Sequence, residues 1–148
     1  MRTSTRLGTV LKDKGYRVWS VSPECSVFLA IAAMAQYEVG SVLVMEGPRL
    51  LGIVTERDYT RRVVLHGRAS KQTGVGEIMS EVVTLSPSHT VAEAMRVMTE
   101  MRVRHLAVTE DGEVRGVLSI GDLVKWVISE QEEQIAQLEL LIAGSYPG

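Results

Sequence analysis

Two short stretches of the sequence place a hydroxyl residue three positions before an aspartate. GIVTERD contains Thr55 and Asp58, and GVLSIGD contains Ser119 and Asp122. An ionised carboxylate can accept hydrogen bonds from both hydroxyls of a ribose, and the amide groups that open a helix favour a phosphate. The same spacing is also that of a capping box, which satisfies the first amide groups of a helix. One copy alone is most simply a cap, whereas two copies in matching contexts favour a pair of binding sites.

Basic side chains accompany the two stretches in different ways. Arg57 lies within the first stretch and Arg61 follows it, whereas Lys125 follows the second. Arginine binds phosphate through planar, charge-assisted hydrogen bonds, although these arginines could equally form a solvated helix face. The candidate residues beside the two aspartates are Gly40, Ser41, Arg57, Arg61, Arg104 and His105. Since Gly40-Ser41 stands at the repeat position of Arg104-His105, we expect the two sites to be unequal.

The chain is a tandem repeat. A shift of 64 residues aligns VWSVSPECSV with VVTLSPSHTV, and residues 18–66 then match residues 82–130 without a gap. Gly52 and Gly116 are among the identical pairs. We expect these two glycines to allow a close backbone approach at the end of a strand. The chain is therefore one duplicated unit.

Each repeat is expected to form a β-α-β-β-α unit. A β-rich run ends at Ser-Pro, which favours extended backbone, and a helix follows with Ser26 or Thr90 as its N-cap. A hairpin comes next, and a second helix begins at Thr55 or Ser119. The expected strands cover residues 18–21, 42–45, 50–54, 82–85, 106–109 and 114–118. Because about fifty residues make a marginal core, we expect the two units to pack sheet against sheet in one α+β domain.

These features resemble the cystathionine β-synthase (CBS) domain pair, or Bateman module. VRHLAV at residues 103–108 and EIMS at residues 77–80 are also typical of that family. The resemblance implies pseudo-two-fold symmetry and, here, a stand-alone pair with a helix ahead of the first repeat. The expected organisation is a helix and lead-in at 1–16, the first repeat at 17–66, a linker at 67–80, the second repeat with an extended helix at 81–143, and a tail at 144–148.

The resemblance also implies a non-catalytic regulatory module that binds adenosyl nucleotides in clefts between the repeats. The ligands of the family are AMP, ADP, ATP, NAD(H) and S-adenosylmethionine, and we expect AMP first. Applied to this sequence, the family pattern implies that Asp58 and Asp122 bind the ribose hydroxyls. It implies that Thr55 and Ser119 lie near the ribose or the phosphate. It places adenine against main chain near the first strand of each repeat, which suggests Val18 and Val82. The module would signal energy or redox state to a partner protein.

Other functions have less support. A structural dimerisation or interaction module with empty clefts is the main alternative, followed by an enzyme and by a nucleic-acid binder that uses residues 57–71. Eighteen acidic against sixteen basic residues give a net charge of -2, which argues against nucleic acid. No histidine or cysteine has metal-ligand spacing, so no metal is expected. Cys25 is the one cysteine, and with no secretory signal or membrane span in the sequence we expect a cytoplasmic protein.

The helix that begins near Asp122 is expected to continue to about residue 143. Its apolar and polar residues alternate in steps of three and four, an a/d seam. The seam consists of Ile128, Gln131, Ile135, Leu138 and Ile142. It could dock on the core of the same chain or on a partner subunit. We expect the second arrangement, in a homodimer.

Overall fold

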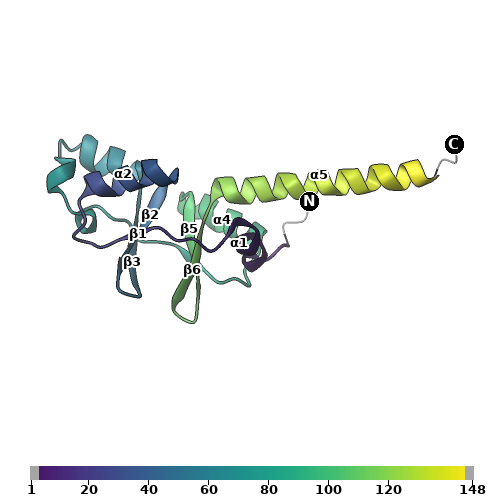
Figure 1. The fold of residues 1–148 in the computed structure, drawn as a ribbon, viewed down its shortest axis with the longest axis horizontal. Helices are drawn as coiled ribbons and strands as arrows, with labels where there is room; N and C mark the ends of the chain where they lie inside the picture. The colour runs from purple at the N-terminus through teal and green to yellow at the C-terminus, as the bar shows by residue number, and fades with distance from the viewer. Residues whose placement is uncertain (1–3, 146–148) are drawn as a thin grey trace.

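The two repeats form two similar lobes that stand side by side, and a long helix extends from the second (Figure 1). The computed structural model describes residues 4–145. The first three residues of the expected lead-in, and residues 146–148 of the expected tail, lie outside this range. Among the described residues, no helix is long and apolar enough to cross a membrane.

Each lobe contains one three-stranded sheet with the same topology. The strand orders are β1-β2-β3 and β4-β5-β6, in which the first pair of each sheet is parallel and the second pair antiparallel. The first lobe contains β1 (Ser20–Val21), α2 (Val27–Tyr37), β2 (Ser41–Glu46), β3 (Arg49–Thr55), α3 (Glu56–Tyr59) and the π-helical turn η1 (Thr60–Val64). The second contains β4 (Thr84–Leu85), α4 (Val91–Met101), β5 (His105–Glu110), β6 (Glu113–Ser119) and α5 (Ile120–Ser145). These elements confirm the predicted α+β fold with two β-α-β-β-α repeats.

The first helix of each repeat begins at the predicted cap. The Ser26 hydroxyl accepts a hydrogen bond from the amide of Leu29. The Thr90 hydroxyl accepts one from the amide of Glu93, whose carboxylate accepts from the Thr90 amide in return. Such caps satisfy donors that have no partner within the helix. The sequence therefore specifies where both helices begin.

The first strand of each repeat is shorter than expected. The strands cover only Ser20–Val21 and Thr84–Leu85. They end where expected, before Ser-Pro, and it is the first two residues of each expected strand that are not part of it. Val18 and Val82 lie before the paired residues and pack into the apolar layer between the sheets.

This layer joins the two lobes. Leu43 and Ile53 of the first sheet and Ala107 of the second are buried in one cluster, with Val117 against it. Residues of both sheets therefore share a core, which confirms the predicted sheet-to-sheet packing.

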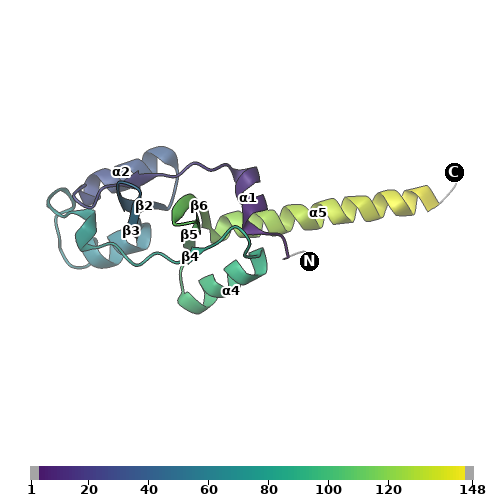
Figure 2. The same cartoon turned by 90° about the horizontal axis from the view of Figure 1, so that it is seen from below.

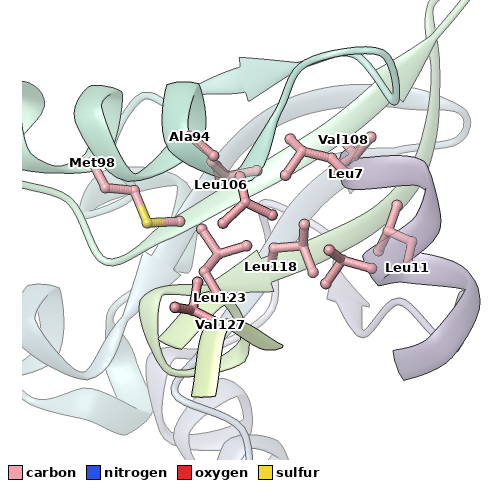
Figure 3. Close-up of a cluster of buried hydrophobic side chains, with 11 residues drawn as sticks. Leu7, Leu11, Ala94, Met98, Leu106, Val108, Leu118, Leu123 and Val127 are labelled. Atoms are coloured by element: carbon pink, nitrogen blue, oxygen red, sulfur yellow. The ribbon is translucent and has the colours of Figure 1, made fainter. Parts of the chain in front are cut away.

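Each repeat is completed by the segment that precedes the other repeat. Helix α1 (Leu7–Lys14) inserts Leu7 and Leu11 into the core of the second repeat, beside Leu118 and Leu123 of β6 and α5 (Figure 3). Figure 2 shows α1 beside the second lobe rather than the first. The helix expected ahead of the first repeat is thus part of the second lobe.

The linker makes the reciprocal contact. Val75 and Ile78, in and after the 3-10 turn η3 (Val75–Glu77), are buried in the core of the first repeat. A second 3-10 turn, η2 (Ser70–Gln72), precedes it. The crossed segments explain how two marginal cores become one folding unit.

The close approach at Gly52 and Gly116 is made by these crossed segments. A Cβ at Gly52 would lie 2.8 Å from the carbonyl oxygen of Ser80, and a Cβ at Gly116 would lie 2.5 Å from Cδ2 of Leu11. The two glycines therefore make room for the chain itself.

Helix α5 is the main departure from the symmetry of the repeats. The first repeat ends in the short α3 and η1, whereas α5 continues to Ser145 and extends beyond the second lobe (Figure 1). The apolar seam residues Ile128, Ile135, Leu138 and Ile142 are 50%, 55%, 58% and 58% exposed. The seam therefore does not dock on the core of its own chain.

Candidate functional site

Asp58 lies at the junction of β3 and α3 and is almost fully buried. Its Oδ2 accepts hydrogen bonds from the amide of Thr55 at 2.9 Å and from the hydroxyl of Thr55 at 3.1 Å. The Thr55 hydroxyl in turn accepts from the amide of Asp58, which completes a capping box. Oδ1 accepts from the hydroxyl of Ser80, in the crossed linker, at 2.8 Å. Three donors thus fix this carboxylate.

Asp122 occupies the same position in the second repeat, with different partners. Its Oδ2 accepts from the amide of Ser119 at 2.8 Å, and the Ser119 hydroxyl accepts from the amide of Asp122 at 3.1 Å. The ammonium group of Lys14, at the end of α1, lies 2.6 Å from the same Oδ2. No described residue hydrogen-bonds to Oδ1. Both predicted capping pairs are present, but Asp122 keeps one oxygen open.

The charge state of Asp122 follows from these contacts. Partial burial acts to raise the pKa of the carboxyl, but the hydrogen bonds from Lys14 and from the Ser119 amide, together with the Lys14 charge, outweigh it. The net result is a pKa below the ordinary value of aspartate. Asp122 is therefore an anion at neutral pH, able to accept hydrogen bonds.

Each aspartate lines a separate cleft. The cleft at Asp122 has a volume of about 920 Å³, and the cleft at Asp58 about 260 Å³. The first lies within the size range of small-molecule sites, roughly 300 to 1,000 Å³, and the second is slightly below it. The structure therefore provides two candidate sites of unequal size.

The clefts bring together most of the candidate residues of the sequence. The Asp122 cleft is lined by Ser119, Gly40, Ser41 and His105. The Asp58 cleft is lined by Thr55, Arg57, Arg61, Arg104 and His105. Arg57 and Arg61, on either side of Asp58 in the sequence, thus line one cleft with Arg104 of the other repeat, while the Gly40-Ser41 pair lines the cleft of Asp122. The described lining of the two clefts includes neither Val18 nor Val82.

His105 lines both clefts. Its ring contacts Gly40 so closely that a Cβ on that glycine would lie 3.2 Å from Nε2. Burial lowers the pKa of His105 below the ordinary value of histidine; the charges of Lys14 and Arg104 act in the same direction, and those of Asp122 and Glu56 oppose it. His105 is therefore mainly neutral at pH 7.

Several lining residues escaped the sequence analysis because they lie in the crossed segments or beyond the motif. Lys14, Tyr16, Arg17 and Trp19 line the Asp122 cleft. The guanidinium of Arg17 lies 5.6 Å from the centre of the Trp19 ring, on which Tyr37 also stacks. A sequence signal existed only for Trp19, which replaces Val83 of the second repeat. Among residues 4–145, no group of three His, Cys, Asp or Glu side chains could hold a metal ion.

Both repeats match a known protein family. The family model described as CBS domain matches residues 15–65 and 75–129. The chain belongs to the CBS domain family. This finding confirms the predicted CBS pair, and CBS domains are regulatory modules.

Three relatives show the extent of the similarity. CBS domain-containing protein CBSX3, mitochondrial, from Arabidopsis thaliana is 38% identical over 97% of this chain and 74% of its own. A CBS-domain protein structure from Burkholderia ambifaria MC40-6 is 46% identical, with a TM-score of 0.83 over 86% of this chain and 96% of that chain. A CBS domain protein from Pyrobaculum aerophilum, solved in complex with AMP, shares the fold with a TM-score of 0.72 at 24% identity, over 79% of this chain and 88% of that one.

Proposed function

We propose that this CBS pair is a non-catalytic regulatory module that binds adenosyl nucleotides in its two clefts. The observation that carries the proposal is the paired position of Asp58 and Asp122, each an anchored carboxylate in the wall of a cleft. A carboxylate fixed by its own helix cap needs no reorganisation to accept the hydroxyls of a ribose. The AMP complex of the Pyrobaculum relative supports an adenine nucleotide as the ligand class.

The Asp122 cleft is suited to a complete nucleoside. The open Oδ1 of Asp122 can accept hydrogen bonds from ribose hydroxyls, because a carboxylate oxygen has two lone pairs. The rings of Tyr16 and Trp19 offer apolar surface for a base. Lys14 and Arg17 line the same cleft and can pair with a phosphate.

The Asp58 cleft uses its carboxylate differently. Oδ2 is occupied by Thr55, and Oδ1 already accepts from Ser80. One acceptor position on Oδ1 is left for a ribose hydroxyl. Arg57, Arg61 and Arg104 supply the positive charge for phosphate.

A ligand in the larger cleft would connect α1 with α5. Lys14 comes from α1, and Asp122 lies in the first turn of α5. A ribose on Asp122 shares the carboxylate with Lys14, so occupancy of the cleft changes the contact between these helices. Helix α5 carries the exposed seam, and we propose that this seam forms a homodimer and passes the signal to a partner protein. A cytoplasmic location remains a prediction, and the Arabidopsis relative is described as mitochondrial.

The main alternative is a structural interaction module with empty clefts, which the exposed seam of α5 also favours. Thermal unfolding with AMP, ADP, ATP, NADH and S-adenosylmethionine distinguishes the two functions. Ligand at a hundredfold excess over its dissociation constant stabilises the fold by about 2.7 kcal/mol. Asp58→Asn and Asp122→Asn, each compared with its own ligand-free midpoint, should lose the stabilisation that comes from their clefts. No shift with any ligand in the parent protein would support the structural alternative.

A further inference from the structure

Four arginines converge at the edge of the Asp58 cleft. Arg57 and Arg61 come from α3 and η1, and Arg102 and Arg104 come from the segment between α4 and β5. All four line the Asp58 cleft and also an adjoining depression of about 410 Å³ over Met98 and Thr99. The arginine surface formed by these four residues therefore continues out of the cleft.

The arginine surface has no acidic counterpart within ion-pair distance among the described residues. The ion pairs of the described chain use Lys14, Arg62, Arg68 and Arg115. One guanidinium nitrogen of Arg57 donates to the backbone carbonyl of Arg102 at 3.0 Å, which ties the two repeats together across the surface. Unpaired guanidinium groups held close together favour an anion of high charge.

The neighbouring charges leave this surface strongly positive. Glu81 and the buried Asp58 also line the cleft. Arg62, the fifth arginine there, already donates to the backbone carbonyls of Ile78 and Met79 and lies 3.9 Å from Asp58. Arg62 therefore offsets Asp58, and Glu81 is the one further acid among the described residues that line the cleft. Glu56, whose charge acts on His105, is a second acid nearby, so four arginines stand against two acids.

The second repeat does not reproduce the arginine surface. The repeat positions of Arg57, Arg61, Arg102 and Arg104 hold Gly121, Lys125, Glu38 and Gly40. The charges of Lys125 and Glu38 cancel, and the two glycines carry no charge. These four positions therefore have no net charge, whereas the four arginines at the matching positions carry four positive charges. Lys14 and Arg17 reach the Asp122 cleft from the other crossed segment. The difference between the clefts is thus one of charge as well as volume.

We propose that the Asp58 cleft selects nucleotides with more than one phosphate, such as a nucleoside triphosphate, and that Arg57, Arg61, Arg102 and Arg104 are the residues that select them. The inference rests on the proposed nucleotide function and assigns a ligand class to one of its two sites. A single phosphate can contact only some of the four arginines at one time. A triphosphate can extend from the cleft over the depression and contact more of them. The Asp122 cleft also adjoins a depression, of about 580 Å³, but acidic residues (Asp13, Glu130 and Glu133) line it beside Lys14 and Lys125. It therefore offers no surplus of positive charge to further phosphates.

Calorimetric titration of the Asp122→Asn variant tests the proposal, because nucleotide binding in that variant depends on the Asp58 cleft. Without divalent metal, we expect ATP to bind at least about tenfold more tightly than AMP, the effect of one additional charge-assisted hydrogen bond. Inorganic tripolyphosphate should compete with ATP. Adding Arg102→Gln, which leaves Arg57, Arg61 and Arg104 in place for the first phosphate, should reduce the ratio of ATP to AMP affinity while AMP affinity changes little. Arg49→Gln, which removes an exposed arginine from the β2-β3 hairpin, is the matched charge control and should leave the ratio unchanged.

Other outcomes have distinct meanings. Equal affinities for AMP and ATP in Asp122→Asn would overturn the inference and leave the proposed function standing. Tight binding of tripolyphosphate without binding of any adenine nucleotide would refute the nucleotide function but support the arginine surface as a polyphosphate site. Tight, salt-sensitive binding of a short oligonucleotide with no preference for ATP over AMP would overturn the inference in favour of nucleic acid.

Discussion

The ammonium nitrogen of Lys14 lies 2.6 Å from Oδ2 of Asp122, so a residue of the N-terminal helix holds the carboxylate of the larger cleft. The repeat position of Lys14 is Ile78, which is buried in the core of the first repeat. At Asp58 the corresponding contact is made by the hydroxyl of Ser80. The two crossed segments therefore both reach the aspartates, but only one of them brings a charge.

The ion pair predicts a small, pH-dependent contribution of Lys14 to stability. Lys14→Met keeps most of the aliphatic stem and removes the charge. Because the side chains are 39% and 26% exposed, we expect a loss of about 0.5 kcal/mol in the free energy of unfolding at pH 7. The folded-state pKa of Asp122 is lowered, so this contribution is present above the ordinary aspartate pKa and disappears as pH falls through the folded value. Urea unfolding between pH 7 and pH 3.5 checks the prediction, with Lys12→Met as the control in the same helix. A difference between parent and Lys14→Met that does not change with pH would contradict it.

The two motif glycines are predicted to differ in their tolerance of a side chain. In Gly52→Ala the new Cβ meets the backbone carbonyl of Ser80, which cannot move without shifting the linker. In Gly116→Ala it meets the end of the Leu11 side chain, which can change rotamer at the cost of some core packing. We expect a loss of about 3 kcal/mol for Gly52→Ala and about 1 to 2 kcal/mol for Gly116→Ala. Chemical denaturation measures both, and equal losses would show that the backbone contact at Gly52 is not the tighter one.

The pH dependence of stability near neutrality is predicted to involve His105. Its folded-state pKa lies below the ordinary value of 6.5 because the ring is buried, so the unfolded chain binds more protons between the two values. Stability from this residue is complete above about pH 6.5 and declines as pH falls toward the folded pKa. Ligand-free His105→Gln should therefore lose less stability than the parent between pH 7.5 and pH 5.5. His66→Gln, at an exposed position, is the control, and parallel pH profiles of parent and His105→Gln would refute the role of His105.

The sequence was sufficient for the local elements but not for the crossing between repeats. Caps at Ser26, Thr90 and Thr55 depend on neighbours three residues away, so their pattern is visible in the chain. The repeat itself predicted the paired sheets and the paired aspartates. The partners Lys14 and Ser80 reach the aspartates from segments far along the chain, and no local pattern identifies them. Likewise, two short stretches suggested the arginines separately, and their convergence into one surface depends on how the repeats pack.

The exposed seam of α5 predicts a dimer that a single charge should weaken. Ile135 and Leu138 are more than half exposed, and with Ile128 and Ile142 they form one stripe at helical spacing. In a homodimer through this stripe, Ile135→Glu would bury a charge at the contact. We expect dissociation to become at least about thirtyfold more favourable, as for loss of a central interface residue. Sedimentation velocity across a concentration series measures the change.

Leu140→Glu provides the matched control for the dimer, since it introduces the same charge into the same helix. Leu140 is 73% exposed and, two residues after Leu138, lies on the opposite side of the helix from the stripe. It should leave the association constant of the parent unchanged. Because the stripe is exposed within one chain, neither variant should alter the unfolding free energy of the monomer by more than about 0.5 kcal/mol. A parent protein that remains monomeric at high concentration, or equal effects of Ile135→Glu and Leu140→Glu, would exclude this stripe as the dimer contact.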